Sequence, residues 1–165
     1  MQIAVCIKSV ADPIALSQRL SCLTDGAWKP ALELSELLDE LPSMMNPGDK
    51  HALEAALAIR DRDPANVEVV CLCAGTNEAF DILREAVAMG ADRAELCLTE
   101  RANALVSAEV LANMINSCTQ ADLVLCSEPS FDAACRQLPA LLASRLGLPY
   151  LNEISKLSRN GGEIL

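Results

Sequence analysis

Short apolar runs alternate with amphipathic helical stripes along this chain, and this alternation limits the fold more than any other feature. The runs have the length and character of buried strands, and they cover residues 3–7, 67–73, 93–98 and 122–126. Between them, apolar side chains recur at spacings of three and four residues, which predicts helices with one buried face. Strands that alternate with helices predict an α/β fold, in which a mainly parallel sheet lies between two helical layers.

Residues that start and stop helices support this division of the chain. Asn46 and Pro47 stand before the first stripe, and Thr76 is positioned to cap the second. Gly90 and Gly147 are each predicted to end a helix, because glycine readily adopts the left-handed conformation found there. The predicted helices therefore have defined ends.

Two segments lie outside this alternation. Residues 12–43 contain amphipathic material, and the pattern leaves open whether they form a helix or a hairpin. Residues 152–165 predict a strand that enters an Asn-Gly-Gly turn and begins to return. At 165 residues, the chain is long enough for one well-buried domain and short for two.

The composition argues against two classes of partner. With 23 acidic and 13 basic residues, the formal net charge is −10, which repels a nucleic-acid backbone or an anionic membrane surface. No apolar run reaches the roughly 18 residues of a membrane-spanning helix, and residues 1–10 lack the features of a secretory signal. We therefore expect a cytoplasmic protein with no nucleic-acid partner and no membrane insertion.

Residues that could carry catalysis are scarce. The eight cysteines form no Cys-x-x-Cys pair and lie mostly in apolar runs, which favours core packing over a metal site or disulfides. The sole histidine, His51, is predicted to be an exposed residue of a first helical turn. The chain has no phosphate-binding P-loop, no GxGxxG fingerprint and no GxSxG motif. The sequence therefore predicts neither a metal ion nor a catalytic residue.

A binding site is predicted at the carboxyl edge of the sheet, where open parallel sheets hold their ligands. Three connections should open there, after residue 7, at residues 73–77 and at residues 127–137, and residues 45–49 should border them. Backbone amides at the helix starts could hold a phosphate. Ordinary strand-to-helix connections are an equally good interpretation of the same residues.

Several segments resemble the β subunit of electron transfer flavoproteins, also called the FixA family. Residues 5–12, VCIKSVAD, are similar to the family's V-C-V-K-Q-V-P-D, and residues 45–57, MNPGDKHALEAAL, to its I-N-P-Y-D-E-Y-A-L-E-E-A-L. Residues 83–96, LREAVAMGADRAEL, are similar to L-R-E-A-L-A-M-G-A-D-R-A, a highly specific string for this family. Residues 121–149 also align with the family pattern without a gap.

This resemblance implies a Rossmann-like domain of the adenine nucleotide α hydrolase type. It also implies an electron-transfer carrier subunit and not an enzyme. In the family, the β subunit pairs with an α subunit that holds a redox-active FAD, and itself binds AMP or, in electron-bifurcating members, a second FAD. Electrons pass between flavin dehydrogenases and a quinone reductase or similar acceptor. The expected partners are therefore the α subunit and flavin dehydrogenases.

The alignment also implies which residues border the nucleotide. They lie at the ends of the strands, at the first helix start and in the connection at 127–138. They are Cys6, Asn46, Pro47, Gly48, Asp49, Ala74, Ser127, Asp132, Cys135, Arg136 and Gln137. By this resemblance, residues 46–49 border the adenosine, whereas the 127–138 connection surrounds the phosphate and keeps Asp132 and Gln137 as its polar members.

The 127–138 connection departs from the family pattern at positions that matter for the ligand. Ser127 replaces the family glycine after the strand. The family run Gly-Asp-Thr-Gly is replaced by Ala133, Ala134, Cys135 and Arg136. Alanine disfavours positive φ and its methyl group blocks close backbone approach, whereas the Arg136 guanidinium could pair with a phosphate or fill its space. We therefore expect an altered AMP or FAD site.

The resemblance covers nearly the whole chain and implies one nucleotide-binding domain, residues 1–165. The sequence ends before the family's C-terminal region, so we expect its acyl-CoA dehydrogenase recognition loop and its α-subunit arm to be absent. Two alternatives stay open. The short chain and altered loop favour a stand-alone adenine-nucleotide-binding regulatory module, whereas a small hydrolase has no support other than the fold.

Overall fold

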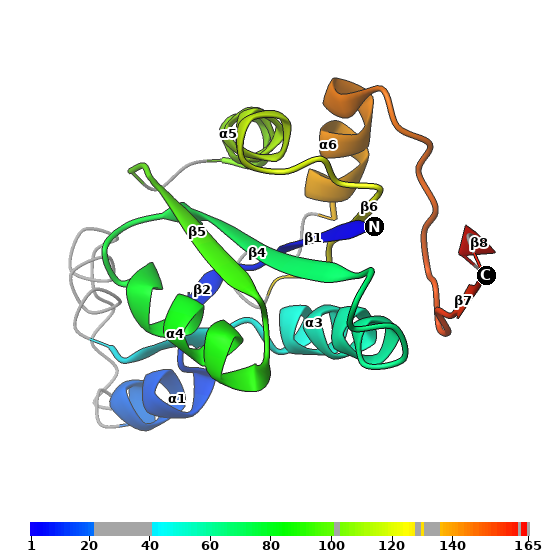
Figure 1. Ribbon diagram of the computed structural model, residues 1–165. Coiled ribbons are helices and arrows are strands. Elements are labelled where there is room, and N and C mark those ends of the chain that lie inside the picture. The colour runs from blue at the N-terminus through cyan, green and yellow to red at the C-terminus, as the bar shows by residue number, and fades with distance from the viewer. Residues whose placement is uncertain (22–40, 101–102, 128–129, 131–135, 162, 165) are drawn as a thin grey trace.

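The computed structural model contains a four-stranded sheet with the spatial order β5-β4-β1-β6 (Figure 1). The strands are β1 (Gln2–Cys6), β4 (Glu68–Gly75), β5 (Arg93–Leu98) and β6 (Leu123–Leu125). The structure describes residues 1–21, 41–100, 103–127, 130, 136–161 and 163–164. Each predicted apolar run forms one of these strands, and every pairing among them is parallel, so the predicted α/β fold is confirmed.

Helices cover both faces of the sheet (Figure 1). Those on one face are α3 (Pro47–Arg60) and α4 (Ala79–Met89), and those on the other are α5 (Ala104–Cys118) and α6 (Leu138–Leu146). Successive strand residues point to opposite faces. Ile3 and Val5 therefore enter the core beneath α3 and α4, whereas Ala4 and Cys6 enter the core beneath α5 and α6. Burial on both faces explains why the strands are continuous apolar runs.

Most of the predicted helix ends are confirmed. Asn46 directly precedes α3, Gly90 ends α4 with a φ of 121°, and Gly147 ends α6 with a φ of 65°. The predicted cap at Thr76 is wrong, because α4 begins three residues later. Thr76 instead offers its backbone carbonyl to the N–H of Ala79 at 3.1 Å, which closes the turn that leads into the helix.

A short antiparallel pair near the N-terminus was not predicted. Its strands are β2 (Ser9–Ala11) and β3 (Ser43–Met45), and β2 leads into α1 (Pro13–Ser21). Residues 22–40, the larger part of the segment left open above, lie outside the described residues. The pair matters for the binding edge because β3 directly precedes Asn46 and so brings the start of α3 to the end of β1.

The predicted C-terminal turn is confirmed, but the strand before it is shorter than predicted. The hairpin consists of β7 (Arg159–Asn160) and β8 (Glu163–Ile164), with Gly161 at a φ of 60° between them. Residues 152–158 pair with no described strand. Leu157 of this segment packs against the core beneath α3 and α4, and Arg159 Nη1 of β7 donates to Asp63 Oδ2 at 2.8 Å, near the end of α3.

The described cysteines are consistent with core packing. All six are free thiols: Cys6, Cys71 and Cys73 are buried in strands, Cys97 and Cys126 are half-buried, and Cys118 is exposed. Burial raises the pKa of Cys71 to about 12 and that of Cys73 to about 11, so both stay protonated at neutral pH. Among the described residues, no helix has both the length and the apolar character needed to cross a bilayer.

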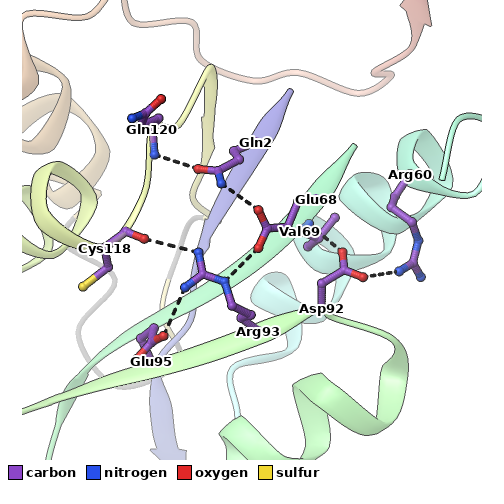
Figure 2. Close-up of polar contacts among 9 residues, drawn as sticks. All are labelled: Gln2, Arg60, Glu68, Val69, Asp92, Arg93, Glu95, Cys118 and Gln120. Atoms are coloured by element: carbon purple, nitrogen blue, oxygen red, sulfur yellow. Dashed lines mark hydrogen bonds and ion pairs between the residues drawn. The ribbon is translucent and has the colours of Figure 1, made fainter. Parts of the chain in front are cut away.

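Side-chain hydrogen bonds join the first residues of three strands at the amino edge of the sheet (Figure 2). Arg93 Nε donates to Glu68 Oε1 at 2.7 Å, and Gln2 Nε2 donates to the other oxygen of that carboxylate at 2.6 Å. Arg93 Nη2 also donates to the carbonyl oxygen of Cys118, at the end of α5, at 3.2 Å. These bonds tie β5, β4, β1 and α5 together.

Asp92 closes the connection between α4 and β5 at the same edge (Figure 2). Its Oδ2 accepts the N–H of Val69 at 2.8 Å, and its Oδ1 accepts from Arg60 Nη1 at 2.9 Å. Residues 83–96, the segment of most specific resemblance, therefore build the amino edge. They lie at the opposite end of the strands from the predicted binding site.

We expect Glu68→Gln to destabilise the protein at neutral pH and to lose this effect in acid. The hydrogen bond from Arg93 is the largest cause that lowers the pKa of the Glu68 carboxyl. A carboxyl whose pKa falls on folding contributes stability above its unfolded value, about 4.3, and this contribution disappears as the pH falls through the folded value. Urea unfolding at several pH values would measure the difference. Glu54→Gln, at an exposed position of α3, is the control. A difference that persists unchanged in acid would contradict this account.

Candidate functional site at the carboxyl edge

Asp49, in the first turn of α3, accepts hydrogen bonds from three chain segments at the carboxyl edge of the sheet. It is only 5% exposed. Its Oδ2 accepts the backbone N–H of Lys8, just beyond β1, at 2.7 Å. Its Oδ1 accepts from Asn46 Nδ2 at 3.2 Å and from the hydroxyl of Ser127, which lies just beyond β6. One carboxylate therefore joins the ends of two neighbouring strands to the start of a helix.

Asn46 occupies the cap position of α3, but its side chain does not cap the helix. It is 1% exposed, and its Nδ2 donates to Ser127 Oγ at 3.1 Å as well as to Asp49. Its backbone N–H donates to the carbonyl oxygen of Lys8 at 2.9 Å, which continues the β2–β3 pairing to the helix start. The fold therefore turns this side chain inward, away from the helix amides that a ligand could use.

Burial raises the pKa of Asp49, and hydrogen bonds from Ser127, Asn46 and Lys8 partly oppose this rise. The carboxyl is thus a buried acid, and both of its oxygens accept hydrogen bonds from donors within the protein. A general base must reach the proton that it removes. Because Asp49 lies beneath its own partners, it holds the edge together and does not form a catalytic group.

Two thiols lie beside this cluster at the strand ends. A hydrogen bond with Cys126 and burial raise the pKa of Cys6 well above its usual range. Cys6 is the last residue of β1 and is 4% exposed. A protonated, buried thiol is a poor nucleophile and a poor metal ligand. No group of three or more histidine, cysteine, aspartate or glutamate side chains within the described ranges could hold a metal ion.

The structure brings four of the predicted ligand residues into direct contact. Asn46, Asp49 and Ser127 form hydrogen bonds to one another, and Gly48 packs against Ser127. Pro47 is the first residue of α3 and lies between the members of this cluster along the chain. That these residues bind a nucleotide stays a prediction.

The remaining predicted residues are distributed along the same edge. Cys6 is the last residue of β1, and Ala74 is the penultimate residue of β4. Gln137 directly precedes α6, and the exposed Arg136 comes just before it. Of these residues, Cys6 lies beside the Asp49 cluster, because the Asp49 charge contributes to the raised pKa of its thiol. The predicted residues Asp132 and Cys135 lie outside the described part of the chain.

Arg136 has a left-handed backbone, with a φ of 50°. A residue other than glycine pays roughly 1 kcal/mol or more for this conformation. Arg136 stands where the resemblance places a glycine, the residue that adopts this backbone conformation most easily. Strained residues of this kind cluster at ligand sites, which is why we retain Arg136 as a candidate.

Sequence reasoning missed one member of the cluster. The backbone N–H of Lys8 donates to Asp49. Every residue except proline has such a donor, so the pattern of side chains does not indicate which one is used. The end of β1 and the register of β2 with β3 place the Lys8 N–H there. The sequence could therefore have indicated the strand end but not the donor.

Comparison with known proteins finds one matching family domain and several similar proteins. Residues 37–165 match the electron transfer flavoprotein domain. The chain is 30% identical to the electron transfer flavoprotein subunit beta of Megasphaera elsdenii, over 99% of this chain and 60% of that protein. It is 32% identical to the caffeyl-CoA reductase-Etf complex subunit CarD of Acetobacterium woodii, over 95% and 56%. Protein FixA of Azorhizobium caulinodans is 33% identical, over 96% and 54%. The chain thus spans between 54% and 60% of the length of these three relatives.

Proposed function

This chain belongs to the electron transfer flavoprotein family, among its β subunits and FixA proteins, and from that membership we propose its function. It forms the nucleotide-binding part of a β subunit that pairs with an FAD-bearing α subunit. Together they pass electrons between flavin dehydrogenases and an acceptor. The chain itself acts as a carrier subunit and not as an enzyme. The observation that carries the proposal is the similarity, over 95–99% of the chain, to an electron transfer flavoprotein subunit beta and to a subunit of a caffeyl-CoA reductase-Etf complex.

The residues at the carboxyl edge fit an altered AMP or FAD site. The Asp49 cluster is closed by its own hydrogen bonds, so we assign it to the support of the site and not to phosphate contact. Arg136 supplies an exposed cation directly before α6, and Gln137 adds an amide. A cation and a helix start both favour a bound phosphate. AMP would contribute no chemistry of its own, whereas a bound FAD would supply an electron carrier.

Purification of the native protein from its own cells tests the pairing. We expect an FAD-bearing partner chain to copurify, and we expect its flavin to be reduced when a reduced flavin dehydrogenase is added. The visible absorption spectrum of the flavin reports both results. A flavin-free homo-oligomer that catalyses a reaction by itself would contradict the proposal.

A stand-alone adenine-nucleotide-binding regulatory module is the second candidate. The observation that favours it is the altered 127–138 connection, in which Ser127 and residues 133–136 depart from the family pattern. Calorimetric titration with AMP, ATP and FAD separates the two candidates. Tight binding of ATP by a flavin-free chain would favour the module, whereas AMP or FAD binding together with an α-type partner would favour the carrier subunit.

The double substitution Ala133→Gly with Ala134→Asp is expected to strengthen AMP binding, by roughly tenfold. Glycine would let the backbone approach the phosphate, and the restored acid would match the family pattern. Calorimetry of AMP binding measures the change. Ala65→Asp, at an exposed position between α3 and β4, controls for the added charge. Unchanged affinity in the double variant would show that these residues do not account for the altered site.

A further inference from the structure

The start of α3 and the end of β6 leave room for one small side chain between them, and Ser127 supplies it. A Cβ atom on Gly48 would lie 2.7 Å from Ser127 Oγ and 2.9 Å from Ser127 Cβ. Contacts this short do not occur between real Cβ atoms and their neighbours. Gly48 does not have a positive φ, so the requirement for glycine comes from space and not from the backbone angle. We call this space the Gly48–Ser127 slot.

The hydroxyl in this slot is used twice within the protein. Ser127 Oγ accepts from Asn46 Nδ2 at 3.1 Å and donates to Asp49 Oδ1. Asp49 is held in turn by the N–H of Lys8 at 2.7 Å. Ser127 is thus fixed both by the shape of the slot and by a chain of hydrogen bonds that ends on β1. Its only proton is donated to Asp49 and cannot also be donated to a ligand.

From this arrangement, and resting on the function proposed above, we propose that Ser127 is a positioning residue for nucleotide binding. It is the last described residue before the connection that runs to Arg136 and α6. By locking the end of β6 onto Asp49, it fixes the point at which this connection begins. Ser127 therefore determines affinity without touching the ligand. Its hydroxyl forms a hydrogen bond to Asp49, and its side chain fills the space beside Gly48.

The first test removes the hydroxyl and keeps the Cβ atom. Ser127→Ala is expected to weaken binding of AMP and of FAD by roughly tenfold, since a hydrogen bond to a carboxylate is lost. Trypsin cleavage after Arg136 should become roughly tenfold faster, because the connection is no longer held at its origin. Ser144→Ala, at an exposed position of α6, is the matched control. Cleavage after the exposed Lys156 is the internal reference for trypsin activity.

The second test moves the side chain to the other wall of the slot. Gly48→Ala alone should destabilise the protein to urea, because its methyl group meets Ser127. Adding Ser127→Gly should restore stability, because one small side chain again fills the slot. The double variant has no hydroxyl, so its AMP affinity should stay low and its cleavage after Arg136 should stay fast. A residue with only a packing role would not separate stability from affinity in this way.

The outcomes distinguish this inference from the proposed function. The double variant could recover AMP affinity and slow cleavage as well as stability. That result would overturn the inference about Ser127, because the hydroxyl would then be irrelevant. Wild-type stability in Gly48→Ala alone would overturn the slot. If the wild type binds neither AMP nor FAD while cleavage after Arg136 responds as expected, the nucleotide function fails. The positioning of the connection by Ser127 would then still be supported.

Discussion

Replacing Asp49 with alanine is expected to lower the free energy of unfolding by about 3 kcal/mol, since a buried donor left unpaired costs about 1–3 kcal/mol. The substitution removes the acceptor of three donors, which belong to Lys8, Asn46 and Ser127. Asn46 is 1% exposed, so water cannot readily replace the lost partner there. Chemical denaturation measures the loss. Asp81→Ala, at an exposed position in the first turn of α4, should change stability little. Equal losses in the two variants would contradict this role of Asp49.

The same residue gives a pH dependence opposite in sign to that of Glu68. Burial raises the pKa of Asp49, so the folded protein holds this proton more tightly than the unfolded chain does. The resulting stability is fully present below the unfolded aspartate pKa, about 3.9, and is lost as the pH rises through the folded value. Wild type should therefore lose stability relative to Asp49→Asn across that interval. A wild type that gains stability relative to Asp49→Asn as the pH rises would contradict the direction of the shift.

Gly90→Ala is expected to destabilise the protein by about 2–3 kcal/mol, the cost of a strongly disfavoured backbone conformation together with crowding. The φ of Gly90 is 121°, which side chains rarely adopt. An added Cβ would lie 3.2 Å from Arg60 Nη2 and 3.6 Å from Leu57 Cδ2. Arg60 cannot retreat freely, because its Nη1 donates to Asp92 at the amino edge.

Gly147→Ala is the matched control for this substitution. Gly147 also follows a helix and has a positive φ, but its φ of 65° lies in the left-handed region and no heavy atom would lie within 4 Å of its Cβ. The expected cost is about 1 kcal/mol, from the backbone alone. Thermal and urea unfolding of both variants measure the difference. Equal losses would show that the contact with Arg60 adds nothing.

The sheet could be predicted from the sequence because its strands are buried on both faces. That burial makes each strand a continuous apolar run, and the spacing of the runs leaves room only for helical crossovers. Gly90 and Gly147 were recognised as stops because each position requires a backbone that glycine adopts readily. Thr76 was misassigned, since a capping residue type marks a turn as readily as a helix start.

The pairing of β2 with β3 could not be predicted. Each strand has three residues, and their partners lie far apart along the chain, so no local pattern records the match. Residues 152–158 show the reverse error, because strand-like composition does not form a strand unless another strand lies beside it. Pairing is a property of the tertiary fold, whereas propensity is a property of the segment.

The location of the candidate site could be predicted from the sequence, but the hydrogen bonds within it could not. Parallel topology and the 45–57 segment indicated that Asn46 and Asp49 would lie at the carboxyl edge. They did not indicate that both side chains turn toward Ser127, which is 81 residues from Asn46 along the chain. That contact depends on the absence of a side chain at Gly48, and a glycine in a helix start gives no hint of what fills its place.

The location of residues 83–96 has a consequence for how such proteins can diverge. The hydrogen bonds of Asp92 and Arg93 secure the amino edge, whereas the positions expected to touch a nucleotide lie at the other end of the strands. Mutations can therefore accumulate at one end while the other continues to specify the fold. A chain that keeps residues 83–96 can therefore be assigned to the family from these residues. Its ligand has to be inferred from the residues at the carboxyl edge.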